Sequence, residues 1–352
     1  MTKFPQFDDV GSFPLPENID TEWFNQFYWV AYKAIARHNV QDIFEHEGIK
    51  NNFIVPMLKS FQLKVNAGVE IINYPQHIDM NTQFLKPIEE YEKEPGLIDP
   101  EMATIPEMFV IDNFAKENYE QTGKALRLKI CVTGPIELYV KKHGFTVYSD
   151  LALNYAKSIN SFVKNSTINN EHLKTEIVSI DEPSFGYIDL FNINEDEIVK
   201  IFDKSLEGIR TTNQIHLHTL GKATTALKCK NVDVLTCEYA SDPKNKIAKQ
   251  VLEKYDKFIR VGITRTNLDN IIAEKLDSGI SMDELKSLTG KLSLIDSKEQ
   301  IKKNLLSAIE LYGDRLKYVG PDCGLGGWQI PQIAFELLRR TSEVIEEIKK
   351  NY

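Results

Sequence analysis

Eight short runs rich in β-branched residues are spaced along the 352-residue chain, and stretches with helical periodicity lie between them. The predicted strands are Asp8–Phe13, Val69–Tyr74, Leu126–Thr133, Glu176–Asp181, Gln214–Thr219, Val232–Glu238, Phe258–Thr264 and Leu316–Val319. The predicted helices include Asp42–Asn66, Ser149–Lys164, Glu195–Arg210, Lys244–Tyr255, Leu268–Leu276, Lys298–Tyr312 and Ile333–Ile348. Such alternation indicates a parallel sheet with right-handed crossovers. Eight repeats favour an α/β fold closed as a (β/α)8 TIM barrel, with a doubly wound open sheet as the alternative.

Three segments do not fit this simple repeat. Residues 21–37 predict an extra N-terminal helix outside it, and residues 76–125 and 136–150 are longer than ordinary barrel loops. We expect these two stretches to form excursions over one end of the barrel. Because no linker or internal repeat interrupts the chain, we expect residues 1–352 to form a single barrel domain.

Composition excludes several classes of protein. Lys and Arg total 42 against 51 Asp and Glu, a formal net charge of −9, and no dense basic block offsets it, so we expect no nucleic-acid partner. No apolar run approaches the ~18 residues of a membrane span, and the N-terminus lacks a signal-peptide pattern. Four cysteines are too few for a disulfide scaffold. These features predict a cytoplasmic protein.

Metal-binding side chains collect where the predicted strands end. In a (β/α)8 barrel the chemistry takes place at the carboxyl ends of the strands, which meet at one rim. The residues expected at that rim are Gly11 and Ser12 after the first strand, Asp181 after the fourth, His216 and His218 in the fifth, Cys237 and Glu238 in the sixth, and Cys323 after the eighth. Imidazole, carboxylate and thiolate together suit zinc.

The strand periodicity restricts how these residues can act. His216 and His218 are two apart, so both imidazoles point to the same side of a regular strand. They could share a metal, one could bind it while the other donates a hydrogen bond, or either could be a core histidine. Cys237 and Glu238 face opposite ways, so at most one enters the site. Cys131, Cys229 and Cys237 are typical of small buried residues, whereas Cys323 lies in a turn and is a candidate thiolate.

Five motifs, in this order, resemble landmarks of the cobalamin-independent methionine synthase family, and more closely its short single-barrel relatives. They are Val10-Gly11-Ser12-Phe13-Pro14, Ile180-Asp181-Glu182-Pro183, His216-Leu217-His218-Thr219-Leu220, Thr236-Cys237-Glu238 and Pro321-Asp322-Cys323-Gly324-Leu325. The resemblance spans nearly the whole chain.

The resemblance implies a ligand set. The family holds zinc with His, Cys, Glu and Cys, and His218, Glu238 and Cys323 fall on three of these positions. The cysteine of the family's H-x-C motif falls on Leu220, which cannot bind metal, so His216 or Cys237 would have to supply a fourth donor. His216 is the better candidate, because it shares a strand face with His218.

The resemblance also implies a substrate site. Homocysteine-binding positions fall on Gly11, Ser12 and Asp181. The family has a further substrate-binding carboxylate in a segment that corresponds to residues 73–80. Pro75 stands where its Glu is expected.

The activity implied by the resemblance is zinc-dependent methyl transfer to the homocysteine thiolate, giving methionine. The folate-dependent enzymes have a histidine after the seventh strand, but residues 262–267 contain none. A methyl-corrinoid carried by a partner protein is therefore the expected donor, rather than methyl-tetrahydrofolate. The alternatives are a zinc-dependent transferase for another thiol, such as coenzyme M, and a binding subunit whose metal site has decayed.

Overall fold

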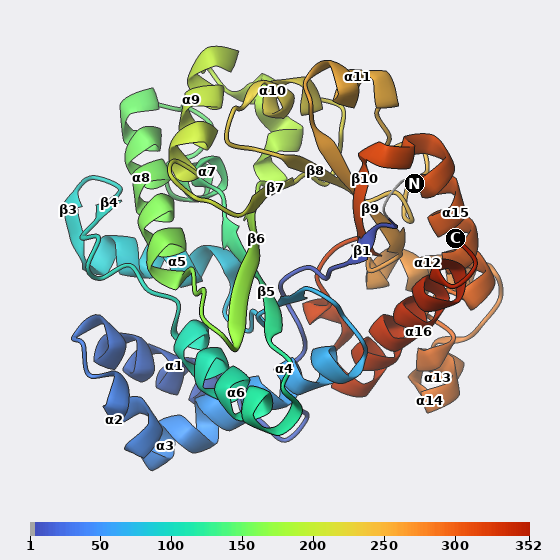
Figure 1. Cartoon of the computed structure of the whole chain (residues 1–352), viewed down its shortest axis with the longest axis horizontal. Coiled ribbons are helices and arrows are strands. Elements are labelled where there is room, and N and C mark those ends of the chain that lie inside the picture. The colour runs from blue at the N-terminus through green and yellow to red at the C-terminus, as the bar shows by residue number, and fades with distance from the viewer. Residues whose placement is uncertain (1–3) are drawn as a thin grey trace.

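The computed structural model describes residues 4–352, and eight parallel strands form its centre (Figure 1). These strands are β1 (Gln6–Phe7), β2 (Ile72–Asn73), β5 (Leu126–Thr133), β6 (Leu173–Asp181), β7 (Thr212–His216), β8 (Val234–Cys237), β9 (Phe258–Thr264) and β10 (Leu316–Pro321). They pair in the order β1-β10-β9-β8-β7-β6-β5-β2. A parallel bridge between Asp8 and Ile71 then joins the two ends of this order. The sheet is therefore closed as a (β/α)8 barrel, as predicted, and the open-sheet alternative is wrong.

Helices surround the ring of strands (Figure 1). They are α1 (Thr21–Ala36), α2 (Val40–Glu45), α3 (Glu47–Ile49), α4 (Val55–Asn66), α5 (Met80–Glu90), α6 (Pro106–Thr122), α7 (Pro135–His143), α8 (Ser149–Ser166), α9 (Glu195–Ser205), α10 (Ala223–Lys228), α11 (Lys249–Lys254), α12 (Leu268–Asp277), α13 (Met282–Lys286), α14 (Leu288–Leu292), α15 (Lys298–Tyr312) and α16 (Pro331–Lys349). The extra N-terminal helix expected at residues 21–37 is α1. None of the helices within residues 4–352 has the length and apolarity that crossing a membrane requires.

The barrel interior is built in layers from alternate strands, as expected for this fold. One layer is apolar and comes from the even-numbered positions in the ring; its members are Ile71, Ile177, Val234 and Tyr318. The other is polar and comes from the odd-numbered positions; its members are Asp8, Lys129, Gln214 and Arg260. Hydrogen bonds from Lys129, Gln214 and Arg260 all end on the Asp8 carboxylate, so this layer crosses the barrel axis.

Two strand boundaries differ from the prediction in ways that affect the rim. The first predicted strand, Asp8–Phe13, is reduced to isolated parallel bridges, Asp8 with Ile71 and Ser12 with Gln76, and Gly11 and Ser12 belong to a loop that follows β1. The fifth, predicted to run to Thr219, ends at His216. His218 therefore lies on a loop, where strand periodicity does not set the direction of its side chain.

The single helix predicted at Asp42–Asn66 is wrong. The chain breaks at His46, whose backbone is extended and whose Nδ1 accepts a hydrogen bond from Ile49 N, so that the ring caps α3. A π-helical segment, Lys50–Ile54, then leads into α4. Helix α4 ends at Asn66, and Gly68, two residues later, has a φ of +85°, which favours a residue without a Cβ.

The long stretch 76–125 carries its own elements. It contains α5, α6 and a small antiparallel pair, β3 (Glu92–Glu94) with β4 (Leu97–Ile98), while α7 occupies most of residues 136–150.

We expect Glu107→Gln to stabilise the fold at high pH. Glu107 is 1% exposed; its Oε1 accepts a hydrogen bond from Gln83 at 3.4 Å, and its Oε2 has no hydrogen-bond partner. Burial raises its pKa from 4.5 to about 8, so folding takes up a proton between these values. Relative to the variant, the wild type should lose about 1.4 kcal/mol of unfolding free energy per pH unit across this window. Denaturant titrations at about pH 5 and about pH 8 measure this, and equal differences at both would contradict it.

Candidate functional site

A cavity of about 770 Å³ opens at the rim where the strands end. It is lined by side chains from four of the predicted rim positions and from the loop after β2. Gly11, Ser12, Asp181, His218 and Cys323 all line it. The structure thus brings the predicted substrate-binding residues and two predicted metal ligands into one cavity.

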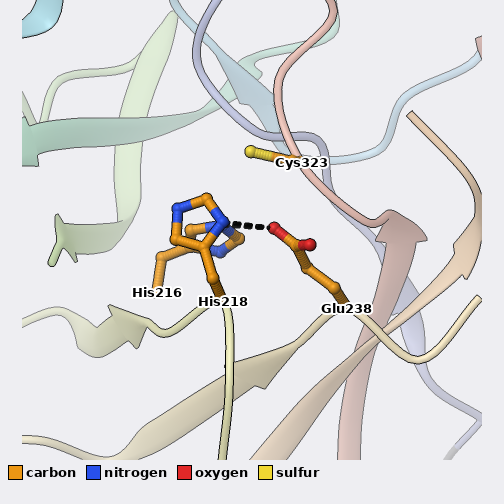
Figure 2. A group of neighbouring side chains, drawn as sticks. All are labelled: His216, His218, Glu238 and Cys323. Atoms are coloured by element: carbon orange, nitrogen blue, oxygen red, sulfur yellow. Dashed lines mark ion pairs between the residues drawn. The ribbon is translucent and has the colours of Figure 1, made fainter. Parts of the chain in front are cut away.

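Four potential metal ligands converge beside this cavity (Figure 2). They are His216, His218, Glu238 and Cys323, and one donor atom from each lies within 4.8 Å of the others. They come from three parts of the ring: the end of β7, the residue after β8 and the loop after β10. The group therefore includes His216 as well as the three residues carried over from the family motifs.

His216 is buried and held by one of its two ring nitrogens. Its Nδ1 lies 2.7 Å from Thr236 Oγ1, and its Nε2, with no hydrogen-bond partner, lies 3.9 Å from Glu238 Oε1. Burial lowers the pKa of His216 well below its ordinary value, so the ring is neutral. A neutral imidazole with one nitrogen anchored and the other unpaired is the form that binds metals.

His218 and Glu238 face each other. His218 Nδ1 lies 2.6 Å from Glu238 Oε1, and its Nε2 lies 3.9 Å from Asp181 Oδ1 (Figure 2). Burial alone would lower the pKa of His218, but the contact with Glu238 and the charge of Asp181 outweigh burial and raise it. In this arrangement a protonated His218 supplies a positive charge between the carboxylates of Asp181 and Glu238.

The Cys323 thiol completes the group. Burial, together with the charges of Asp181 and Glu238, raises its pKa well above the ordinary value, so a bound cation is needed to favour the thiolate. Its backbone N donates to Thr266 Oγ1 at 3.1 Å. The preceding residue, Asp322, accepts hydrogen bonds from Ala240 N and Ser241 N at 3.1 and 2.7 Å. Asp322 therefore ties the loop of Cys323 to the loop that follows Glu238.

Asp181 also lines the cavity, beside His218. Its Oδ1 is buried without a hydrogen-bond partner, and burial raises its pKa to about 6. A substrate ammonium group beside it would favour the charged form.

Gly11 and Ser12 are fixed by packing against neighbouring loops. A Cβ at Gly11 would lie 1.9 Å from Gln76 Oε1, so a larger residue there would displace the Gln76 side chain. Ser12 Oγ accepts a hydrogen bond from Gly326 N at 3.2 Å, and Ser12 O accepts one from Leu325 N at 2.7 Å. Ser12 thus links the first loop of the chain to the loop that carries Cys323.

No protein-family model matches the chain. A methionine synthase from Methanocaldococcus jannaschii is 26% identical over 247 residues, which cover 67% of this chain and 70% of that protein. A B12-independent methionine synthase from Shewanella sp. W3-18-1, in complex with selenomethionine, superposes with a TM-score of 0.60 at 16% identity over 99% of both chains. A putative vitamin-B12-independent methionine synthase from Listeria monocytogenes gives 0.57 at 14% identity, over 98% and 99% of the two chains.

The chain is thus similar in sequence to a methionine synthase and similar in fold to B12-independent methionine synthases. The likeness in sequence agrees with the family motifs, and the likeness in structure confirms the barrel.

The family motifs locate some of the converging side chains but not others. Leu220, expected at the place of a metal-binding cysteine, is 8% exposed and packs in the hydrophobic core. Cys237 is also buried in the core, as are Cys131 and Cys229. None of these four is in the group of metal-binding side chains, which His216 joins instead. From the segment 73–80, Gln76 and Asp79 line the cavity and Pro75 does not.

Three residues that hold the site were not predicted: Thr236, Thr266 and Asp322. Their partners are backbone atoms or ring nitrogens of segments far away in sequence. Asp322 and Thr236 gave a signal, because the first shares a family motif with Cys323 and the second shares one with Glu238.

Proposed function

We propose that this protein is a zinc-dependent methyltransferase that methylates the thiolate of homocysteine to give methionine. One observation carries the proposal: four N, O and S donors converge at the edge of a cavity that also holds the Asp181 carboxylate, whose Oδ1 has no hydrogen-bond partner. Such a mixed donor set suits zinc. The named relatives support methyl transfer as the reaction.

The donors fit a metal ion without rearrangement of the fold. His216 Nε2 is buried and has no hydrogen-bond partner, and unpaired buried polar atoms are rare in native proteins. We therefore assign His216, His218, Glu238 and Cys323 as the zinc ligands. The intact set of four also argues against a binding subunit with a decayed metal site.

Zinc bound there would hold the substrate sulfur as a thiolate at neutral pH, where a free thiol of pKa ~8.5 is mostly protonated. The chain's own residues would do the rest. Asp181 would pair with the substrate ammonium group, and the loop of Gly11 and Ser12 would form the wall of the cavity beside it. Held in line with the methyl donor, the sulfur would gain several kcal/mol from positioning alone.

The geometry supports a shifted reading of the H-x-C motif. If His216-Leu217-His218 takes the place of H-x-C, then His216 corresponds to the family's histidine and His218 to its first cysteine. Every family ligand position is then filled by a side chain that converges here. Compared with the family's ligand set, an imidazole replaces one thiolate. The site then has one negative charge fewer, and a bound metal would be more electrophilic.

If His218 corresponds to the family's first cysteine, a cysteine at position 218 should bind zinc and a cysteine at position 220 should not. We expect His218→Cys to keep zinc affinity near the wild-type level, because it restores the family's donor set. His218→Ala should bind zinc much more weakly, and adding Leu220→Cys to it should give no recovery, because that side chain packs in the core. Zinc affinity by chelator competition tests all three variants, and recovery by Leu220→Cys would favour the original reading.

We further propose a methyl-corrinoid, carried by a partner protein, as the methyl donor. Among the described residues that line the cavity, none is Lys or Arg, while Glu17, Asp79 and Asp181 are acidic. A cavity of this charge disfavours the polyanionic tail of a folate polyglutamate. The absence of histidine at residues 262–267 points the same way.

An activity panel tests the proposed function. Zinc-loaded protein is incubated with homocysteine or coenzyme M, each with methylcobalamin or methyl-tetrahydrofolate, and the methylated thiol is measured. We expect methionine from homocysteine and methylcobalamin. Methylation of coenzyme M alone would move the assignment to the other thiol, and no product from any pair would contradict the proposal.

A further inference from the structure

His218 lies where the sheet no longer holds the backbone. β7 ends at His216 and α10 begins at Ala223, so His218 is on the connecting loop, and its side chain is 40% exposed. Side chains on loops are placed less accurately than those on strands unless a neighbour fixes them. His216, by contrast, is the last residue of the ladder, paired with Thr236 of β8.

The side chain of Asn245 fixes this loop. Its Nδ2 donates to His218 O at 2.8 Å, and its Oδ1 accepts from Leu220 N at 2.8 Å. One carboxamide therefore binds an acceptor and a donor two residues apart, on the turn that directs His218 toward the cavity and Leu220 into the core.

Asn245 also belongs to the loop that begins with Glu238. Asn245 N donates to Asp242 O at 2.9 Å, and Asp242 N donates to Glu238 O at 3.3 Å. The chain from Glu238 to Asn245 thus connects a ligand that follows β8 with a ligand that follows β7. Because the side chains of His218 and Glu238 face each other at 2.6 Å, small shifts of either loop would separate them.

We infer that Asn245 is a positioning residue of the metal site: it holds His218 against Glu238 so that both side chains can bind one ion. This inference rests on the proposed function, because it takes His218 as a zinc ligand. Asn245 supplies no donor atom to the ion. Its effect on metal affinity therefore runs through the backbone of His218.

Zinc affinity of the Asn245→Ala variant tests the inference. Outer partners of metal ligands are worth roughly 10- to 100-fold in affinity, and we expect a loss in this range by chelator competition. Asn165→Ala is the matched control, because Asn165 Nδ2 donates to Pro100 O and Ala103 O at 2.7 and 2.8 Å, away from the cavity. Its zinc affinity should be unchanged. Co²⁺ substituted for zinc reports the geometry, and its absorption bands should shift in Asn245→Ala only.

A double-mutant cycle with His218→Ala separates positioning from a general structural role. If Asn245 acts through His218, removing it should cause no further loss of zinc affinity once the imidazole is gone. An equal loss in both backgrounds would overturn the inference, as would wild-type affinity and an unchanged Co²⁺ spectrum in Asn245→Ala. Asn245→Asp keeps the acceptor for Leu220 N and should lose less affinity, which gives a second variant if Asn245→Ala does not fold. Wild-type protein that binds no zinc would instead refute the proposed function itself.

Discussion

Cys323→Ser should lower zinc affinity by at least roughly 100-fold and abolish methyl transfer. Cys323 supplies the only sulfur among the four donors, and a neutral serine hydroxyl replaces a thiolate. Removing an outer partner of a metal ligand already costs 10- to 100-fold, so removing the one charged sulfur ligand should cost no less. Zinc content after dialysis and chelator competition measure the effect.

Cys229→Ser is the control for this substitution. Cys229 is 0% exposed, its Sγ lies 3.7 Å from Thr225 O, and it is not among the four donors. It should keep wild-type zinc affinity. If Cys323→Ser also kept its zinc, Cys323 could not be a ligand.

Asp8→Asn should lower the free energy of unfolding by about 3–5 kcal/mol. The Asp8 carboxylate lies 2.5 Å from Arg260 Nε and 2.9 Å from Lys129 Nζ, and all three side chains are buried in the barrel. No other carboxylate of the described residues lies within ion-pair distance of these two cations. An isosteric amide would leave both charges buried without a counter-charge, which is the costly way to break a buried pair.

The loss should shrink as the pH falls. Burial raises the pKa of Asp8, but Arg260 and Lys129 outweigh burial and hold it below 3.8. The stabilisation by the carboxylate is therefore complete above pH 3.8 and is lost as the pH falls through the lower folded value. Urea unfolding at neutral and acidic pH tests this. Asp314→Asn, which breaks a surface pair with Lys249, is the control and should have little effect on stability at any pH. A similar small cost for Asp8→Asn would mean that the polar layer does not stabilise the barrel.

The strand count and the barrel could be predicted because each strand is a short, buried, β-branched run that ends at a turn residue. Rim residues could be predicted for the same reason: the carboxyl ends of parallel strands meet at one edge. His218, Glu238 and Cys323 do converge, together with His216. Strand order brings these strand ends and loops to one rim, whereas the direction of the His218 side chain depends on its loop.

The end of β7 could not be predicted, and this affected the reading of the site. The run Gln214–Thr219 has no breaker before Gly221, so pattern alone extends the strand past His218. In the fold, Asn245 binds the backbone at 218 and 220 and turns the chain away from the sheet. Asn245 lies 27 positions from His218 and 25 positions from Leu220, so these contacts leave no trace in local periodicity. On the shifted reading proposed above, the family cysteine corresponds to position 218, two residues before Leu220, where the motif comparison places it.

X-ray absorption at the zinc edge tests whether zinc at this site binds the substrate thiol. Zinc-loaded protein is measured alone and with homocysteine. We predict that zinc has one sulfur neighbour, Cys323, at about 2.3 Å in the protein alone, and two when homocysteine binds. A sulfur count that stays at one, in protein shown to bind homocysteine, would contradict the claim that this site activates the substrate thiol.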